Sequence, residues 1–120
     1  MKKVSELEGP ELDYWVAKAE GLDAVLACGM CQVLVCADSD SKCYSERRYH
    51  DSWVNAGPII ERERIAIRPS EIIREGDWDG WIANKGDSFY SDKSALEAAM
   101  RCFVASIFGE EVDDRQAHPI

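Results

Sequence analysis

Arginine and aromatic side chains are concentrated in the middle of the chain, although the chain as a whole is acidic. Six of its eight arginines lie between residues 47 and 74, and tryptophans and tyrosines lie among them or shortly after them. An aromatic plane can stack on a nucleobase, and a guanidinium group can bind a phosphate through two parallel hydrogen bonds. A nucleotide or another planar anion is therefore the ligand that this combination predicts. The candidate ligand-binding residues are Arg47, Arg48, Tyr49, Trp53, Arg62, Arg64, Trp78 and Trp81.

The same residues also fit an alternative that involves no ligand. In a chain of 120 residues, tryptophans are often needed to close the ends of a small core. The arginines could likewise form ion pairs with the nearby Glu61, Glu63 and Glu71. The sequence leaves both possibilities open.

The spacing of the cysteines gives little support for a metal site. Cys28 and Cys31 have the two-residue separation that zinc sites use, but Cys36 and Cys43 do not form a second close pair. Cys36 also lies in an apolar run, where a small buried thiol is ordinary. We therefore expect no metal and no cofactor. Because the five cysteines are an odd number and no export signal is recognised, we expect reduced thiols.

The acids and histidines form no catalytic pattern. The run DWDG at residues 77–80 lacks most of the ligands of a calcium loop. Glu61 and Glu63 have arginine neighbours, so they fit a surface strip of ion pairs better than a pair of catalytic acids. His50 and His118 have no serine or cysteine nucleophile in a recognisable motif, and there is no glycine-rich phosphate loop. We therefore expect that the protein is not an enzyme.

The balance of charge restricts the possible partners. The chain has 14 basic and 23 acidic residues, with a formal net charge of -9, and this charge repels nucleic-acid backbones and anionic membranes. We expect no non-specific binding to nucleic acid. No run approaches the roughly 20 apolar residues of a membrane span, so we expect no membrane association and a cytoplasmic location. An acidic surface would suit a basic protein partner.

The elements that must position these side chains follow from capping residues and periodicity. The Gly-Pro pair at 9–10 begins a helix, apolar residues follow at helical spacing, and Gly21 ends it. The run 24–37 predicts two strands with a turn at residues 29–30. The polar segment 38–52 predicts an exposed loop.

The next part of the chain predicts short elements. Pro58 after Gly57 suits the first turn of a helix, which would give way to a short strand at 65–67. An extended run through the whole segment is the alternative. Further short strands are expected at 72–73 and 81–83.

The last helix is the clearest element of the sequence. Ser94 and Glu97 form a capping-box pattern, an apolar face follows, and Gly109 ends the helix. Because a helix lies near each end with strands between, we expect an α+β fold in which the two terminal helices pack on one face of a small antiparallel sheet. Residues 1–112 would form this single domain, and residues 113–120 a frayed acidic tail.

Three segments form a recognisable combination: LDYWVAKAEG at residues 12–21, YSERRYHDSWVNAGPIIERERIAI at 44–67 and ALEAAMRCFVASIFGEEVD at 95–113. In this order they resemble a family of small bacteriophage proteins called NinX-like. Its members show a similar first helix, a tryptophan followed by GPIIERE, and a last helix of the type AAMR. The resemblance spans nearly the whole chain and implies a phage or prophage protein that acts in the host cytoplasm.

The family's central motif falls on Trp53 and on residues 57–62. The resemblance brings no catalytic residue with it. The segment CGMCQVLVC departs from the family pattern, which is a further reason to expect no metal site common to the family.

From these observations we expect a phage accessory protein that binds without catalysis. It would sequester a small nucleotide-derived ligand, such as a host immune signalling molecule, in a pocket at the interface of a homo-oligomer. Two other functions remain open. One is a protein-interaction module whose acidic surface binds and inhibits a host protein, and the other is a hydrolase of a nucleotide signal.

Overall fold

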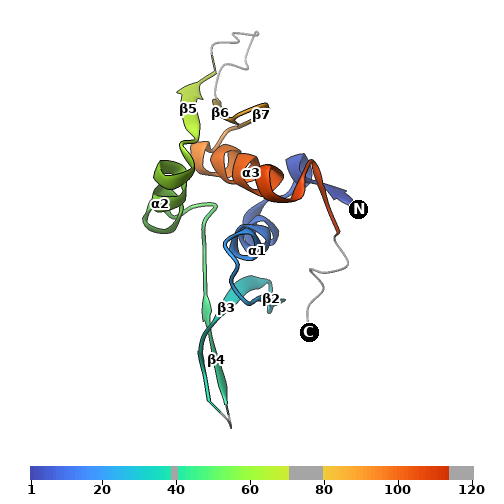
Figure 1. Ribbon diagram of the computed structural model, residues 1–120, viewed down its shortest axis with the longest axis vertical. Helices are drawn as coiled ribbons and strands as arrows, with labels where there is room; N and C mark the ends of the chain where they lie inside the picture. Colours follow the sequence, from blue (N-terminus) through green and yellow to red (C-terminus); the bar gives the residue numbers. More distant parts are fainter. Residues whose placement is uncertain (39–40, 71–79, 114–120) are drawn as a thin grey trace.

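The computed structural model describes residues 1–38, 41–70 and 80–113. Over these residues the chain forms three α-helices, a short 3₁₀-helix and three small antiparallel sheets (Figure 1). The expected α+β fold is confirmed, but the strands are divided among three sheets instead of being gathered in one. The strand expected at 72–73 and nearly all of the tail expected at 113–120 lie outside the described residues.

The two ends of the described chain lie side by side, because the first strand, β1, pairs with the last, β8. The other sheets have the strand orders β2–β3–β4 and β5–β6–β7. No helix among the described residues is long and apolar enough to cross a membrane. In chain order the elements are β1 (Lys2–Lys3), η1 (Val4–Glu6), α1 (Gly9–Ala19), β2 (Ala24–Ala27), β3 (Met30–Ala37), β4 (Lys42–Glu46), α2 (Trp53–Glu63), β5 (Ala66–Pro69), β6 (Trp81–Lys85), β7 (Ser88–Asp92), α3 (Ala95–Phe108) and β8 (Glu111–Val112).

Helix α3 lies at the centre of the molecule, between the β6–β7 hairpin and α1 (Figure 1). Its ends are those that the sequence predicts. The Ser94 hydroxyl accepts the backbone N–H of Glu97 at 3.3 Å, and Gly109 ends the helix with a φ of 91°. Leu96 and every residue from 98 to 105 are buried, so α3 supplies much of the core.

Helix α1 packs on the β2–β3 hairpin. Trp15 is only 2% exposed, and its ring packs edge-on against Tyr14 and Phe108 with centroid distances of 5.2 and 5.4 Å. The hairpin is confirmed, with its turn at Cys28 and Gly29, one position before the expected one. Both residues have positive φ, 55° and 73°, which is typical of the tight two-residue turns that match the twist of a hairpin.

Two predictions for the middle of the chain were wrong. Segment 38–52 is not a loop throughout, because Lys42–Glu46 forms β4 and pairs with β3. All five residues of β4 are exposed, so the alternation that usually reveals a strand is missing. Helix α2 begins at Trp53 and not at Pro58, because the Ser52 hydroxyl caps it by accepting the N–H of Asn55 at 3.4 Å. Pro58 lies inside the helix, and this also excludes the extended alternative.

Candidate ligand-binding cleft

Two exposed tryptophans from different elements line one cleft of about 500 Å³. Trp53 is the first residue of α2 and is 59% exposed, and Trp81 is the first residue of β6 and is 39% exposed. Large aromatic side chains that remain this exposed beside a cavity are typical of binding sites. The cleft is lined by His50, Asp51, Trp53, Ile67, Trp81, Ser94, Ala95 and Leu96.

Local structure fixes the position of each tryptophan. Trp53 follows the capping residue Ser52, and the Asn55 side-chain amide donates to the carbonyl of Arg48 at 2.8 Å, which ties the first turn of α2 to the preceding segment. Trp81 faces Pro69 in the β5–β6 ladder. Both residues therefore begin regular elements. The wall at Trp81 is held by strand pairing, and the wall at Trp53 by side-chain hydrogen bonds at the start of α2.

A buried network around Asp13 supports the wall of the cleft at His50. Asp13 is 1% exposed, and its Oδ1 accepts the backbone N–H groups of Tyr49 and His50, each at 2.8 Å. Its Oδ2 lies 2.6 Å from the Nδ1 of His50. Burial raises the pKa of the Asp13 carboxyl, while these N–H donors act in the opposite direction. The imidazole of His50 is thus held in one orientation at the cleft.

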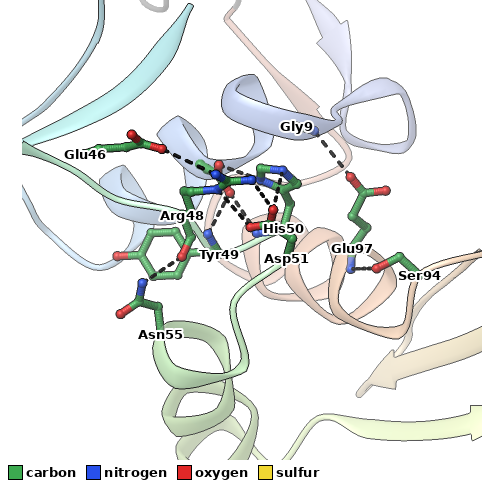
Figure 2. A network of polar contacts seen from close by, with 10 residues as sticks. Gly9, Glu46, Arg48, Tyr49, His50, Asp51, Asn55, Ser94 and Glu97 are labelled. Carbon is green, nitrogen blue, oxygen red and sulfur yellow. Dashed lines mark hydrogen bonds and ion pairs between the residues drawn. The ribbon is translucent and has the colours of Figure 1, made fainter.

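Arg48 and Asp51 form an ion pair beside His50 (Figure 2). The Arg48 guanidinium donates to Asp51 through Nε at 3.0 Å and also through NH2, and it lies 3.8 Å from Glu46. The hydrogen bond from Arg48 lowers the pKa of the Asp51 carboxyl. The positive charge of Arg48 is therefore already matched by acids of the protein itself.

A second cleft of about 310 Å³ is lined by the Asp13 network itself. His50 and Asp13 line it together with the buried Cys31. Burial raises the pKa of the Cys31 thiol to about 12. A thiol with so high a pKa stays protonated near neutral pH and is a poor nucleophile. The other lining residues are Pro10, Met30, Glu46 and Arg48.

The structure brings together only part of the predicted site. Trp53 and Trp81 meet at the first cleft, and Arg48 lines the second. Tyr49, which we expected at the ligand, is 2% exposed and belongs to the core. Trp78 lies outside the described residues.

The remaining three predicted arginines line neither of these clefts. Arg62 pairs instead with Glu20 at 2.7 Å and with Glu63 at 2.8 Å. Arg64 is the exposed residue that ends α2, with a φ of 54°. The backbone N–H of Arg47 donates to the carbonyl of Cys31 at 2.9 Å and so extends the β3–β4 ladder. The predicted cluster of arginines is thus dispersed over several elements.

The cysteines likewise do not converge. Cys28 lies in the exposed hairpin turn, Cys31 is buried, and Cys36 and Cys43 face each other as exposed partners on β3 and β4. Within residues 1–38, 41–70 and 80–113, no three histidine, cysteine or acidic side chains are grouped closely enough to hold a metal ion. The acidic DWDG run lies almost entirely outside this part of the chain.

Two buried polar residues, one of which supports the site, were missed in the sequence. Asp13 lies on the inner side of α1, and Arg101 lies on the inner side of α3 with 5% exposure. Arg101 donates to the carbonyl of Leu7 at 2.9 Å and lies 3.3 Å from Asp92. The available signal was a charged residue among the apolar residues of a helix that faces the core. Such a residue indicates a buried charge, which needs a specific partner.

Comparison with known protein families identifies the family of the chain. The family model of NinX from bacteriophage P22 matches residues 3–107. No curated protein matches the chain significantly. Because the matched region covers most of the 120 residues, the chain belongs to the NinX family of bacteriophage proteins.

Proposed function

We propose that this phage protein is a non-catalytic binder of a small nucleotide-derived molecule, which it takes up in the cleft between Trp53 and Trp81. The observation that carries this proposal is that both exposed tryptophans line a single cleft, whereas Trp15 is buried. An indole face gives a nucleobase about 1–3 kcal/mol of stacking. The remaining lining groups can fix the orientation of the base or sugar by hydrogen bonds.

The charges at the cleft favour recognition of the base and sugar over recognition of the phosphate. Among the described residues, neither a lysine nor an arginine lines the cleft, and Asp51 contributes a carboxylate. The first turn of α3 also lines the cleft through Ala95 and Leu96. The N-terminal end of a helix carries free N–H groups and a partial positive charge, so this end is where a phosphate group would be placed.

The surroundings of His50 support binding without turnover. Its Nδ1 lies 2.6 Å from Asp13, and its Nε2 lies 3.7 Å from Asp51. Both ring nitrogens therefore face carboxylates of the protein. A bound ligand would remain intact, so the protein would act in the host cytoplasm as a stoichiometric sponge for a signalling nucleotide of host immunity.

Native mass spectrometry with a nucleotide panel tests this proposal. The panel contains nucleoside phosphates, cyclic dinucleotides and cyclic ADP-ribose derivatives. We expect one class to bind at a fixed ratio and to be released unchanged by heat. Chemical conversion of the released ligand would favour the hydrolase alternative, and no binding by any class would contradict the proposal.

A second candidate function, binding of a basic host protein, is favoured by a separate acidic feature. Phe89 is 69% exposed and lines a cleft of about 260 Å³ with two acids, Glu110 and Glu111, and one lysine, Lys3. A basic segment with an apolar side chain would fit this surface. A host protein that co-purifies with the wild type, is released by high salt and is lost with Phe89→Ala would support this function.

A further inference from the structure

The distal parts of strands β3 and β4 form an arm that extends away from the helices (Figure 1). Strand β2 has four residues and pairs with β3 only from Met30 to Val33. The N–H of Leu34 still donates to the carbonyl of Asp23. Beyond it, among the described residues, β3 and β4 pair only with each other. Strand β4 is therefore an edge strand, and such edges can pair with another chain.

The outer edge of β4 presents the backbone groups of alternate residues. At one end, the N–H of Arg47 donates to Cys31 on β3, and at the other, the carbonyl of Ser41 accepts from Asp38. Because residues alternate along an antiparallel strand, the odd-numbered residues from 41 to 47 direct their backbone groups toward β3. The irregularity between Leu34 and Cys36 lies on β3 and does not interrupt this alternation on β4.

It follows that Lys42, Tyr44 and Glu46 direct their backbone N–H and C=O groups away from β3. Their side chains also share one face of the strand, because side chains alternate with a period of two. All three residues are exposed. The outer edge thus carries a positive charge at one end, an aromatic ring in the middle and a negative charge at the other end.

We propose that this edge binds a second copy of the chain, with the two β4 strands antiparallel and Tyr44 on the two-fold axis. Lys42 of each copy then lies opposite Glu46 of the other, and the two Tyr44 rings lie side by side. Six backbone hydrogen bonds can form, two between the Tyr44 residues and four between the Lys42 and Glu46 residues. A parallel arrangement would instead place like charges opposite each other, which is unfavourable.

This dimer is independent of the proposed nucleotide cleft, since none of the three residues lines the cleft between Trp53 and Trp81. Glu46 lies 3.8 Å from Arg48, and this exposed, long contact leaves its carboxylate able to pair with Lys42 of a second copy. A single short strand from each copy buries little surface, so the dimer is expected to be weak and dependent on concentration.

Charge reversal with mixing tests both the dimer and its register. Lys42→Glu places two acids on the edge, and Glu46→Lys places two lysines there. Each variant alone should dissociate with a Kd at least about tenfold higher than that of the wild type, because two attractive pairs become two repulsive pairs. An equimolar mixture should form heterodimers at least as readily as the wild type, because both pairs are attractive again.

Sedimentation equilibrium from micromolar to millimolar concentration is the measurement, with a thiol reductant present to exclude disulfides of the exposed Cys36 and Cys43. The wild type should approach twice the 13.5 kDa of one chain. Circular dichroism of each variant confirms the fold, and Lys93→Glu, an exposed reversal outside β4, is the control that should dimerise normally. The proposal would be overturned if the wild type stays monomeric at every concentration. It would also be overturned if neither charge reversal changes the Kd of the dimer.

Discussion

The carboxylate of Asp13 on α1 holds the imidazole of His50, with 2.6 Å between Oδ2 and Nδ1. The two residues are 37 positions apart in the chain, and the bond connects the first helix to the segment that leads into α2. Because the Asp13 side chain is buried and accepts from three donors, its removal leaves buried N–H groups without an acceptor.

We therefore expect Asp13→Ala to lower the free energy of unfolding by about 2–4 kcal/mol. Asp13→Asn keeps the volume and one acceptor oxygen, so its loss should be clearly smaller. Urea denaturation of the two variants beside the wild type measures both effects. If Asp13→Ala lowers the free energy of unfolding by less than about 1 kcal/mol, the network does not stabilise the fold.

The cysteines should differ sharply in their reactivity. Burial raises the pKa of Cys31 to about 12 and that of Cys102 to about 11, so at mildly alkaline pH both remain protonated as well as inaccessible. Iodoacetamide should label Cys28, Cys36 and Cys43, which are exposed, and leave the other two unmodified. Peptide mass spectrometry identifies the labelled sites, and the denatured protein, in which all should react, is the control. Labelling of native Cys31 as fast as Cys36 would contradict its burial.

Arg62 should contribute to stability and not to ligand binding. Its side chain is 50% exposed and pairs with Glu20 and Glu63, and exposed ion pairs contribute about 0.2–1 kcal/mol. Arg62→Ala should therefore reduce the free energy of unfolding by at most about 1 kcal/mol, with no change in ligand affinity. A large loss of affinity would instead support the site that the sequence predicted around this arginine.

Replacement of Arg64 by glycine should stabilise the protein. Arg64 ends α2 in the left-handed region, with a φ of 54°, and the next N–H, that of Ile65, donates to the carbonyl of Ile60 at 3.0 Å. Glycine adopts this conformation without strain, so Arg64→Gly should raise the free energy of unfolding by about 0.5–1 kcal/mol. Thermal unfolding measures the change, with Arg64→Ala as the control that keeps the strain. If the glycine variant unfolds at a lower temperature than the alanine variant, this account of the cap is wrong.

The elements that the sequence predicted well are those with local signals. Helix α3 has its cap at Ser94 and its end at Gly109, and α1 has Pro10 in its first turn. The start of α2 was missed because Pro58 usually marks a first turn, whereas Ser52 is the residue that caps this helix. Strand β4 was missed because its residues are exposed on both faces.

The candidate site depends on contacts between distant parts of the chain. Trp53 and Trp81 were each identified from their type, but their meeting at one cleft requires the β5–β6 pairing and the packing of α2 on α3. The predicted grouping of arginines was based on their proximity in sequence. In the structure, Arg48 and Arg62 are matched by acids from other positions, such as Asp51 and Glu20, and spacing alone does not reveal these partners.

The measurement that tests the central claim most directly is calorimetric titration of the ligand class identified by mass spectrometry into the wild type and two variants, Trp53→Ala and Trp81→Ala. Each variant should lose about fivefold or more in affinity, since one stacked indole contributes about 1–3 kcal/mol. Val54→Ala, at an 84% exposed neighbour on α2 that does not line the cleft, should bind like the wild type. Equal affinity in all four proteins would contradict the assignment of the cleft between Trp53 and Trp81 as the binding site.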